Sequence, residues 1–355
     1  MAEIINMKVV GVGGAGSNVV SRMKRSGMGG VGYACINTDR SALGSAAAEE
    51  KLQIGERLTK GQGAGSRPEV GQMAAEEGKN AISKLFENVD AVFLTAGMGG
   101  GTGTGAAPVV AEAARAAGAL TVGVVSLPFR WEGARKMRTA EQGVQALLEQ
   151  VDTLFVIPND NLGKIAGKVS FAKSFDVSDE ILNRAVGGIA DLLRSTGFIN
   201  LDFADLKTIL RGSGLAHLGI GEASGKSKVE EAAAQVIRSE LMETGIAGAR
   251  RLIVNVIISQ DLPMDDVSAV MERIQAAAHP DANIIFGIGF DEKLVDALRV
   301  IVIATDFDGS DAREADAAAA EEVAQVAEKQ RKSPSPRTEG GAPDDDWDIW
   351  KKFFE

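Results

Sequence analysis

The first half of the chain alternates short apolar runs with helical patterns. Five runs have the composition of β-strands, namely residues 8–16, which end in a glycine turn, and residues 32–36, 91–94, 120–127 and 154–158. The run at 120–127 is apolar throughout, as in strands buried on both faces of a parallel sheet. Because helical segments separate the runs, we predict a parallel sheet with right-handed crossovers and with its loops gathered at the carboxyl ends of the strands.

The longest helical pattern covers residues 178–196. Its apolar side chains keep to one face at helical spacing: Ile181, Leu182, Ala185, Val186, Ile189, Leu192 and Leu193. We expect Ser178 to cap this helix and Gly197 to follow its last turn. Beyond residue 206 the pattern restarts as a second α/β unit, with strands predicted at 252–259, 283–288 and 299–304 and helices at 228–243 and 265–278.

The composition is that of a globular protein without a basic surface. The chain has 355 residues, enough for two domains, of which 45% are hydrophobic and 25% charged. The net charge of -11 argues against nucleic acid or an anionic membrane as the main partner. Cys35 is the only cysteine, which excludes an intrachain disulfide and suits a reducing cytoplasm. We expect neither a signal peptide nor insertion into a membrane.

The stretch DAVFLTAGMGGGTGTG, residues 90–105, carries the strongest chemical signal. A run of strand formers gives way to clustered glycines, which let a backbone approach an anion closely, and the start of the next helix adds its positive dipole end. The stretch has no lysine, so amides, threonine hydroxyls and a bound cation would have to neutralise a phosphate. A flexible linker is the alternative, but linkers seldom join a strand directly to a helix.

Two further glycine clusters precede this stretch. Gly11, Gly13 and Gly16 satisfy the G-x-G-x-x-G fingerprint, and Asp39 follows the next strand where a ribose-binding acid is expected. A nicotinamide-dependent oxidoreductase is therefore a rival hypothesis, although that fold needs one phosphate loop and this chain has two. The cluster KGQGAGSRP, residues 60–68, can close over a nucleotide or form a surface turn.

Two groups of charged residues each allow two interpretations. Glu132 lies among basic residues, either in a solvated ion-pair face or as a ribose ligand with a base near the phosphates. Asp202 and Asp205 in the segment NLDFAD either cap the next helix or take part in chemistry.

Two other features are predicted to carry no chemistry. The segment GEASGKS, residues 221–227, ends like a Walker loop but is one residue too short. His217 and His279 are far apart in the sequence and have no ligand-like neighbours, so we expect no zinc site.

The composition changes near residue 309. Residues 309–343 contain alanine-rich, basic Ser-Pro and turn-forming stretches, which predict a flexible linker. The chain ends in DDDWDIWKKFFE, residues 344–355, with Trp347, Trp350 and Phe354 at helical spacing. Aromatic residues with no core to join suggest a peptide that docks on a partner, whereas a helix on the membrane surface is disfavoured by the leading acids.

Seven motifs in this order resemble those of the FtsZ family, the bacterial relatives of tubulin. They are GVGGAGSN at residues 11–18, NTD at 37–39, GAGS at 63–66, GMGGGTGTG at 97–105, PFRWEG at 128–133, IPND at 157–160 and NLDFAD at 200–205. The resemblance covers residues 8–307 and implies an α/β tubulin/FtsZ fold. Its parts would be a Rossmann-like GTP-binding domain with a parallel sheet (1–177), a central helix (178–197), a smaller α/β domain for GTPase activation and polymerisation (198–308), the linker, and the partner-binding peptide.

The resemblance also implies an activity. The family hydrolyses GTP to GDP and phosphate, polymerises head to tail into filaments and forms the cytokinetic Z ring at the division site in the cytoplasm. The ligands would be GTP or GDP, with Mg²⁺ accompanying the nucleotide. The partners would be other copies of the chain, together with membrane tethers or regulators of division that bind the C-terminal peptide.

Site residues can be carried over motif by motif. The phosphates would be held by Gly14, Ala15, Gly16, Ser17, Asn18, Gly101, Thr102 and Gly103. Glu132 would bind the ribose with Lys136 close by, and Asn159, Phe175 and Asp179 would hold the base. An aspartate suits guanine, because a carboxylate can accept hydrogen bonds from both N–H donors on the Watson-Crick edge of guanine.

The predicted central helix places the remaining acids elsewhere. If Asp179 contacts the base from the first turn, Asp202 and Asp205 lie beyond the other end, more than about 25 Å away by helical rise. They would instead act on the nucleotide of a neighbouring copy in an open-ended stack. There, together with Asn200, they would be the catalytic residues that polarise a water and help to place the cation. We expect no other metal site.

Two positions depart from the family pattern. The family usually has an arginine where this chain has Lys136, and a lysine cannot form a bidentate fork to phosphate. In the C-terminal peptide, Asp348-Ile349 is followed by Trp-Lys-Lys-Phe-Phe in place of a proline and Phe-Leu-Arg. A noncatalytic scaffold of the same fold remains an alternative, although it would be expected to have lost NLDFAD or the glycine loop.

Overall fold

The computed structural model describes residues 5–27, 29–161, 171–194, 199, 201–239, 245–259, 261–292 and 294–307. At residues 171–177, 180 and 191–194 only the backbone is described. Residues 1–308 form one compact unit. The predicted linker and C-terminal peptide lie outside the described residues.

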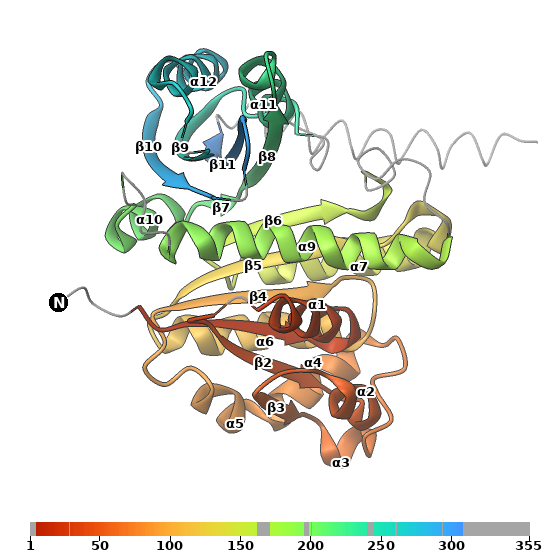
Figure 1. Cartoon of the computed structure of the whole chain (residues 1–355). Coiled ribbons are helices and arrows are strands. Elements are labelled where there is room, and N and C mark those ends of the chain that lie inside the picture. Colours follow the sequence, from red (N-terminus) through yellow and green to blue (C-terminus); the bar gives the residue numbers. More distant parts are fainter. Residues whose placement is uncertain are drawn as a thin grey trace, which may run out of the picture. The chain divides into compact units, whose positions relative to one another are not determined.

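A seven-stranded sheet in which every neighbouring pair is parallel forms the first half (Figure 1). Its strands are β1 (Met7–Val12), β2 (Gly32–Asn37), β3 (Glu50–Gln53), β4 (Ala91–Gly97), β5 (Leu120–Leu127), β6 (Thr153–Pro158) and β7 (Gly214–Leu215). Their spatial order is β3-β2-β1-β4-β5-β6-β7, so the direction of winding reverses between β1 and β4. In open parallel sheets, ligands bind outside the carboxyl ends of the strands at such a reversal.

Helices cover both faces of this sheet. One apolar core joins it to α1 (Gly13–Arg25), α2 (Arg40–Ser45) and α9 (Phe171–Arg194). A second core joins the opposite face to α4 (Pro68–Glu77), α5 (Lys79–Lys84), α6 (Thr102–Ala116) and α7 (Ala134–Leu148). The connections include α3 (Glu56–Thr59) and two short 3-10 turns, η1 (Arg130–Glu132) and η2 (Asn159–Asn161). The predicted parallel α/β sheet is confirmed.

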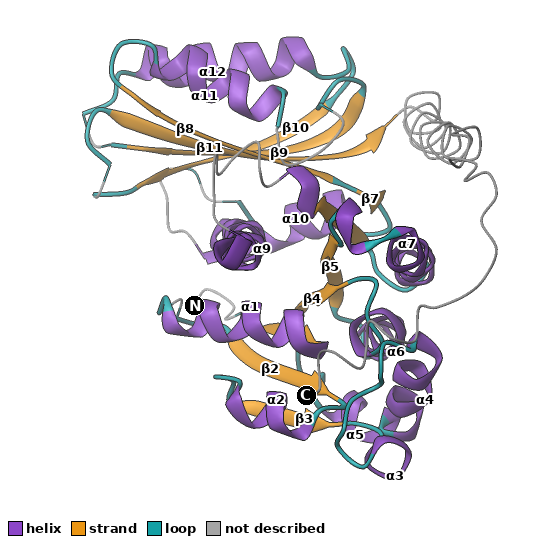
Figure 2. Cartoon of the chain, turned by 90° about the vertical axis from the view of Figure 1, so that its right-hand side faces the viewer, coloured by secondary structure: helices purple, strands orange, loops and turns teal. Residues whose placement is uncertain are grey.

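A smaller mixed sheet follows. Its strands are β8 (His217–Ser224), β9 (Ala249–Ile258), β10 (Asn283–Phe290) and β11 (Ala297–Phe307), in the order β10-β9-β11-β8. Helices α11 (Lys228–Ile237) and α12 (Met264–Ala277) cover one face. The other face shares the first core with α9 through Leu218, Ile253, Ile301 and Ile303. Both views place α9 between the two sheets (Figures 1 and 2).

Helix boundaries differ from the prediction in several places, and α11 ends at Ile237 instead of at residue 243. Helix α9 is already formed at Phe171, so Ser178 lies inside it and the prediction that Ser178 caps it was wrong. The Ser178 hydroxyl instead donates to Oδ1 of Asn159 at 2.8 Å, because a serine inside a helix has no free amide to cap. Helix α1 begins at Gly13, inside the glycine turn that ends the first predicted run.

One strand of the smaller sheet was not predicted. The segment of residues 217–224, which contains the start of the Walker-like sequence, forms β8 and pairs antiparallel with β11. Helix α11 begins at Lys228, immediately after this Walker-like segment.

Candidate functional site

Two helices begin side by side at the reversal point of the large sheet. Helix α1 follows β1 and α6 follows β4, and the residues before them, Val12 and Gly101, provide no side-chain cap. The first amides of a helix have no partner within the helix, and the dipole concentrates positive charge at that end. The two uncapped ends therefore form a site suited to an anion such as a phosphate.

The two glycine loops also touch each other closely. Gly13 has a φ of 74°, and a Cβ placed there would lie 2.9 Å from the backbone nitrogen of Gly103. A Cβ at Gly103 would lie 2.6 Å from the carbonyl oxygen of Gly97. Only glycine lets the end of β4 and the starts of both helices approach this closely. The residues therefore fit a ligand that is held by backbone amides from both loops.

The phosphate residues predicted from the sequence come together here. Gly14, Ala15 and Asn18 are exposed on the first turns of α1, and Gly16 and Ser17 are buried beneath them. The methyl group of Ala15 lies 2.8 Å from the position that a Cβ would take at Gly97.

The start of α6 is also tied to β2. The hydroxyl groups of Thr102 and Thr38 lie 2.7 Å apart in a hydrogen bond. Thr38 was not among the predicted site residues, although its place in NTD, directly after a strand, was a signal.

The third glycine cluster lies against the central loop. A Cβ at Gly101 would lie 2.8 Å from the methyl group of Ala64 and 2.9 Å from the nitrogen of Arg67. Residues 65–67 are exposed at the tip of this segment. The segment is therefore a surface turn, and it also borders the phosphate loop. Closing over a nucleotide stays a prediction for it.

Glu132 and Lys136 lie after β5, in η1 and in the first turn of α7. Oε1 of Glu132 accepts a hydrogen bond from the backbone nitrogen of Phe129 at 2.9 Å, and Oε2 pairs with the ammonium of Lys136. The Glu132 side chain is only 12% exposed, whereas that of Lys136 is 41% exposed. A Cβ at Gly99 would lie 2.9 Å from Cγ of Lys136, so the lysine lies between the phosphate loop and the glutamate.

The loop after β6 connects these groups to α9. Asn159 is buried and accepts the hydrogen bond of Ser178, the neighbour of half-buried Asp179. The carboxylate of Asp160 accepts from the backbone nitrogen of Arg130 at 3.2 Å. The structure thus brings the regions of Glu132, Asn159 and Asp179 together. Phe175 lies on α9, but its side chain is outside the described part of the structure.

Asp202 and Asp205 lie at the start of the next helix, at the end of the large sheet opposite the glycine loops. Asp202 takes the cap position of α10 (Phe203–Leu210), but its side chain makes no capping hydrogen bond, and both acids are exposed. In Figure 1 the strand arrowheads and α10 are at opposite ends of the large sheet. From Asp179 to the end of α9 the helical rise alone gives about 22 Å. The acids therefore cannot reach the glycine loops of their own chain; Asn200 lies outside the described residues.

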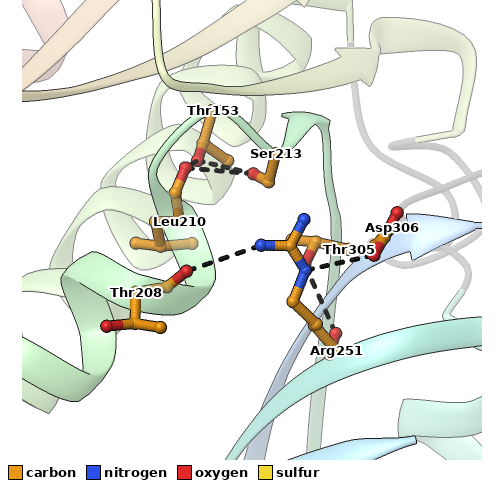
Figure 3. A network of polar contacts seen from close by, with 7 residues as sticks. All are labelled: Thr153, Thr208, Leu210, Ser213, Arg251, Thr305 and Asp306. Carbon is orange, nitrogen blue, oxygen red and sulfur yellow. Dashed lines mark hydrogen bonds and ion pairs between the residues drawn. The ribbon is translucent and has the colours of Figure 1, made fainter.

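A polar network fixes the far end of α10 (Figure 3). The hydroxyl of Thr153 on β6 donates to the carbonyl of Leu210 and shares a 2.9 Å hydrogen bond with Ser213. Arg251 on β9 donates from Nη1 to the carbonyl of Thr208 at 3.5 Å and from Nε to Asp306 at 3.2 Å. Helix α10 is therefore attached to both sheets.

Among the described residues, no three or more His, Cys, Asp or Glu side chains gather closely enough to hold a metal ion. None of the described helices has both the length and the apolar composition needed to cross a membrane.

Comparison with known proteins agrees with the fold. Residues 6–167 match the model of the Tubulin/FtsZ family, GTPase domain, and residues 214–308 match the FtsZ family, C-terminal domain. An FtsZ dimer from M. jannaschii is similar at 40% identity and a TM-score of 0.81, covering 85% of this chain and 88% of that one. A point mutant of FtsZ from M. jannaschii has the same identity and TM-score, with 85% and 91% covered.

A more distant relative shares the fold alone. CetZ2 from Haloferax volcanii, in a structure described as a GTPγS-bound protofilament, is 23% identical with a TM-score of 0.75, covering 91% of this chain and 100% of that one. The two family matches and the 40% identity over most of both chains establish that this chain belongs to the FtsZ family.

Proposed function

We propose that the chain hydrolyses GTP and polymerises head to tail, and that each active site is completed by acids of the next copy. One observation carries this proposal: the two uncapped helix ends lie at one end of the large sheet, and exposed Asp202 and Asp205 lie at the other. Contacts between unlike ends of identical subunits generate open filaments. The separation along α9 thus explains why one copy alone is incomplete.

Binding would use groups from the glycine loops and the loops beside them. The first amides of α1 and α6, with the hydroxyl of Thr102, would hold the phosphates. Glu132 would accept from a ribose hydroxyl through the oxygen that now pairs with Lys136, and Asp179 would accept from guanine. Family membership makes a nicotinamide cofactor untenable, because the matching domain is a GTPase domain.

Hydrolysis would need the acids of the neighbour. Asp202 and Asp205, with Asn200, would orient and polarise the attacking water in line with the bond to the γ-phosphate. Mg²⁺ that arrives with the nucleotide would neutralise charge on the phosphate oxygens. Because Asp202 and Asp205 are exposed and the Asp202 side chain is not used as a helix cap, their carboxylates are available to a neighbouring copy.

The cellular role we propose is that of a cytoskeletal filament in the division ring at midcell. Residues 344–355 would dock on a membrane tether or a regulator. A fluorescent fusion that spreads evenly through dividing cells, when the cells depend on it for division, would contradict this part of the proposal.

Light scattering and phosphate release, measured against protein concentration, test the biochemical proposal. We expect GTP, but neither GDP nor ATP, to produce scattering. Phosphate release per subunit should rise steeply above a threshold concentration. A rate per subunit that is the same at all concentrations would contradict it, and absent hydrolysis with intact assembly would indicate a noncatalytic scaffold.

A further inference from the structure

Leu201 packs into the space left on the smaller sheet by the missing side chain of Gly287, called the notch below. A Cβ placed at Gly287 would lie 3.0 Å from Cγ and 3.2 Å from Cδ1 of Leu201, and 3.3 Å from Oδ1 of Asn255. The space that any other side chain would need at position 287 is therefore filled by the residue directly before Asp202. No left-handed backbone angle occurs at Gly287, so the contact and not the conformation favours glycine there.

The backbone on the other side of Asn200 is attached to the same strand. The nitrogen of Ile199 donates to the carbonyl of Ile288 at 3.2 Å, and the nitrogen of Ile288 donates to the carbonyl of Ile199 at 3.0 Å. In the order of the smaller sheet, β10 is an edge strand, and an edge strand has backbone groups free for such pairing. Two adjacent residues of β10 thus hold the segment that contains the three candidate catalytic residues.

This attachment complements the network at the far end of α10. Arg251 and Thr153 hold the carbonyls of Thr208 and Leu210, whereas the side chain of Asp202 makes no capping bond at the start of the helix. The position of the first turn, which includes Asp205, must therefore come from its own apolar packing and from the residues before it. Phe203, in that turn, and Leu201, directly before Asp202, are both packed against the core.

We propose that Leu201 and Gly287 are positioning residues for hydrolysis, and that the fit of the leucine into the notch sets where Asp202 and Asp205 meet the neighbouring nucleotide. The proposal rests on the proposed function. Neither residue touches the nucleotide. Displacing a catalytic group by about 1 Å can cost on the order of 100-fold in rate, so a methyl group added beneath Leu201 is enough to matter.

Gly287→Ala tests the fit, and Gly289→Ala is its matched control. Both glycines lie on β10 and both are buried, but a Cβ at Gly289 would meet nothing within 4 Å. In Gly287→Ala we expect kcat per assembled subunit to fall at least about tenfold. KM for GTP, GTP affinity and assembly with a slowly hydrolysed GTP analogue should stay near wild type. Gly289→Ala should keep the wild-type rate.

A second pair of variants protects the test against a folding defect. Leu201→Ala empties the notch without a clash, and we expect it to lower kcat while binding of GTP persists. In the double variant Leu201→Ala with Gly287→Ala, the added methyl enters the space that the leucine has left. Its turnover should exceed that of Gly287→Ala, which two independent defects could not produce.

The outcomes separate this proposal from the proposed function. If wild type shows concentration-dependent turnover but Gly287→Ala matches Gly289→Ala, the positioning role is overturned and the function stands. The same holds if the double variant is no faster than Gly287→Ala. If wild type itself does not hydrolyse GTP at any concentration, the proposed function fails, and the positioning role fails with it.

Discussion

Glu132 and Lys136, four residues apart in the sequence, form an ion pair, and the alkyl stem of Lys136 lies against Gly99 of the phosphate loop. The side chain of Lys136 thus links Glu132, which is expected to bind the ribose, to the glycine loop that is expected to bind the phosphates. Binding of a ribose hydroxyl to Glu132 would leave the ammonium of Lys136 beside the phosphates, where it can act as a point charge.

Replacing Lys136 should therefore alter nucleotide affinity. For Lys136→Gln we expect GTP affinity to fall by about three- to tenfold, since a charge-assisted contact is lost. For Lys136→Arg we expect affinity at or above wild type, because a guanidinium can form two parallel hydrogen bonds. Titration calorimetry with GTP measures both. An unchanged affinity in Lys136→Gln would mean that the pair is only a surface ion pair.

The close contact at Gly103 leads to a second prediction. Gly103→Ala would push the start of α6 away from the carbonyl of Gly97, which lies 2.6 Å from the added Cβ. We expect GTP affinity to fall by at least about tenfold while the circular dichroism spectrum stays that of wild type. Gly44→Ala is the control, because a Cβ there meets nothing within 4 Å and its binding should be unchanged. Wild-type affinity in Gly103→Ala would disprove the phosphate site.

The acids at the other end should separate binding from hydrolysis. In Asp205→Ala we expect GTP affinity within about twofold of wild type and a loss of turnover of at least about 100-fold, as for removal of a group that acts only in the transition state. Filter binding and phosphate release report the two quantities. Loss of GTP binding in this variant would place Asp205 at the pocket of its own chain and would refute the argument from α9.

His217 should make the smaller sheet sensitive to acid. It begins β8, and its ring packs edge-on against Phe307 with the ring centroids 4.3 Å apart. Burial lowers its pKa from 6.5 to about 4. Between these values the unfolded chain binds a proton that the folded chain does not. Above about pH 6.5 His217 does not lower the free energy of unfolding. As the pH falls from there toward 4, its protonation in the unfolded chain lowers that free energy by up to about 3 kcal/mol.

Thermal unfolding at pH 7.5 and pH 5 checks this prediction. The melting temperature of wild type should fall further between the two pH values than that of His217→Gln, whose side chain cannot be protonated. Equal decreases in both proteins would show that His217 does not cause the acid sensitivity.

Five strands of the large sheet were predictable because they are mostly buried and apolar, whereas the short, more exposed β3 and β7 were not predicted. The run at 120–127 coincides with β5. Strand β8 was not predicted, because Gly219 and Gly221 interrupt its apolar pattern. Cβ atoms there would lie 2.7 Å and 2.3 Å from carbonyls of Val236 and Ala232, so these glycines let α11 pack against the strand.

The candidate site was predictable where its residues are local in sequence. The two phosphate loops each follow a strand and precede a helix, and that pattern predicts an anion site at each of them. The contact between Leu201 and Gly287 joins positions that are far apart in the chain, so no local sequence pattern predicts it. The beginning of α9 was predicted wrongly because serine is a common helix cap. The hydroxyl of Ser178 instead donates a hydrogen bond to Asn159, which lies in the loop after β6.

Mixing two variants with defects at opposite ends of the subunit tests the shared active site most directly. Asp205→Ala keeps the nucleotide site, and Gly103→Ala keeps the acids, so one interface of each mixed pair contains a complete set. We predict that the mixture hydrolyses GTP several times faster than the sum of the two separate rates. The mixture should stay inactive when the acid donor carries Gly103→Ala and Asp205→Ala together. A rate equal to that sum, with co-assembly of the two variants verified by sedimentation, would contradict the account.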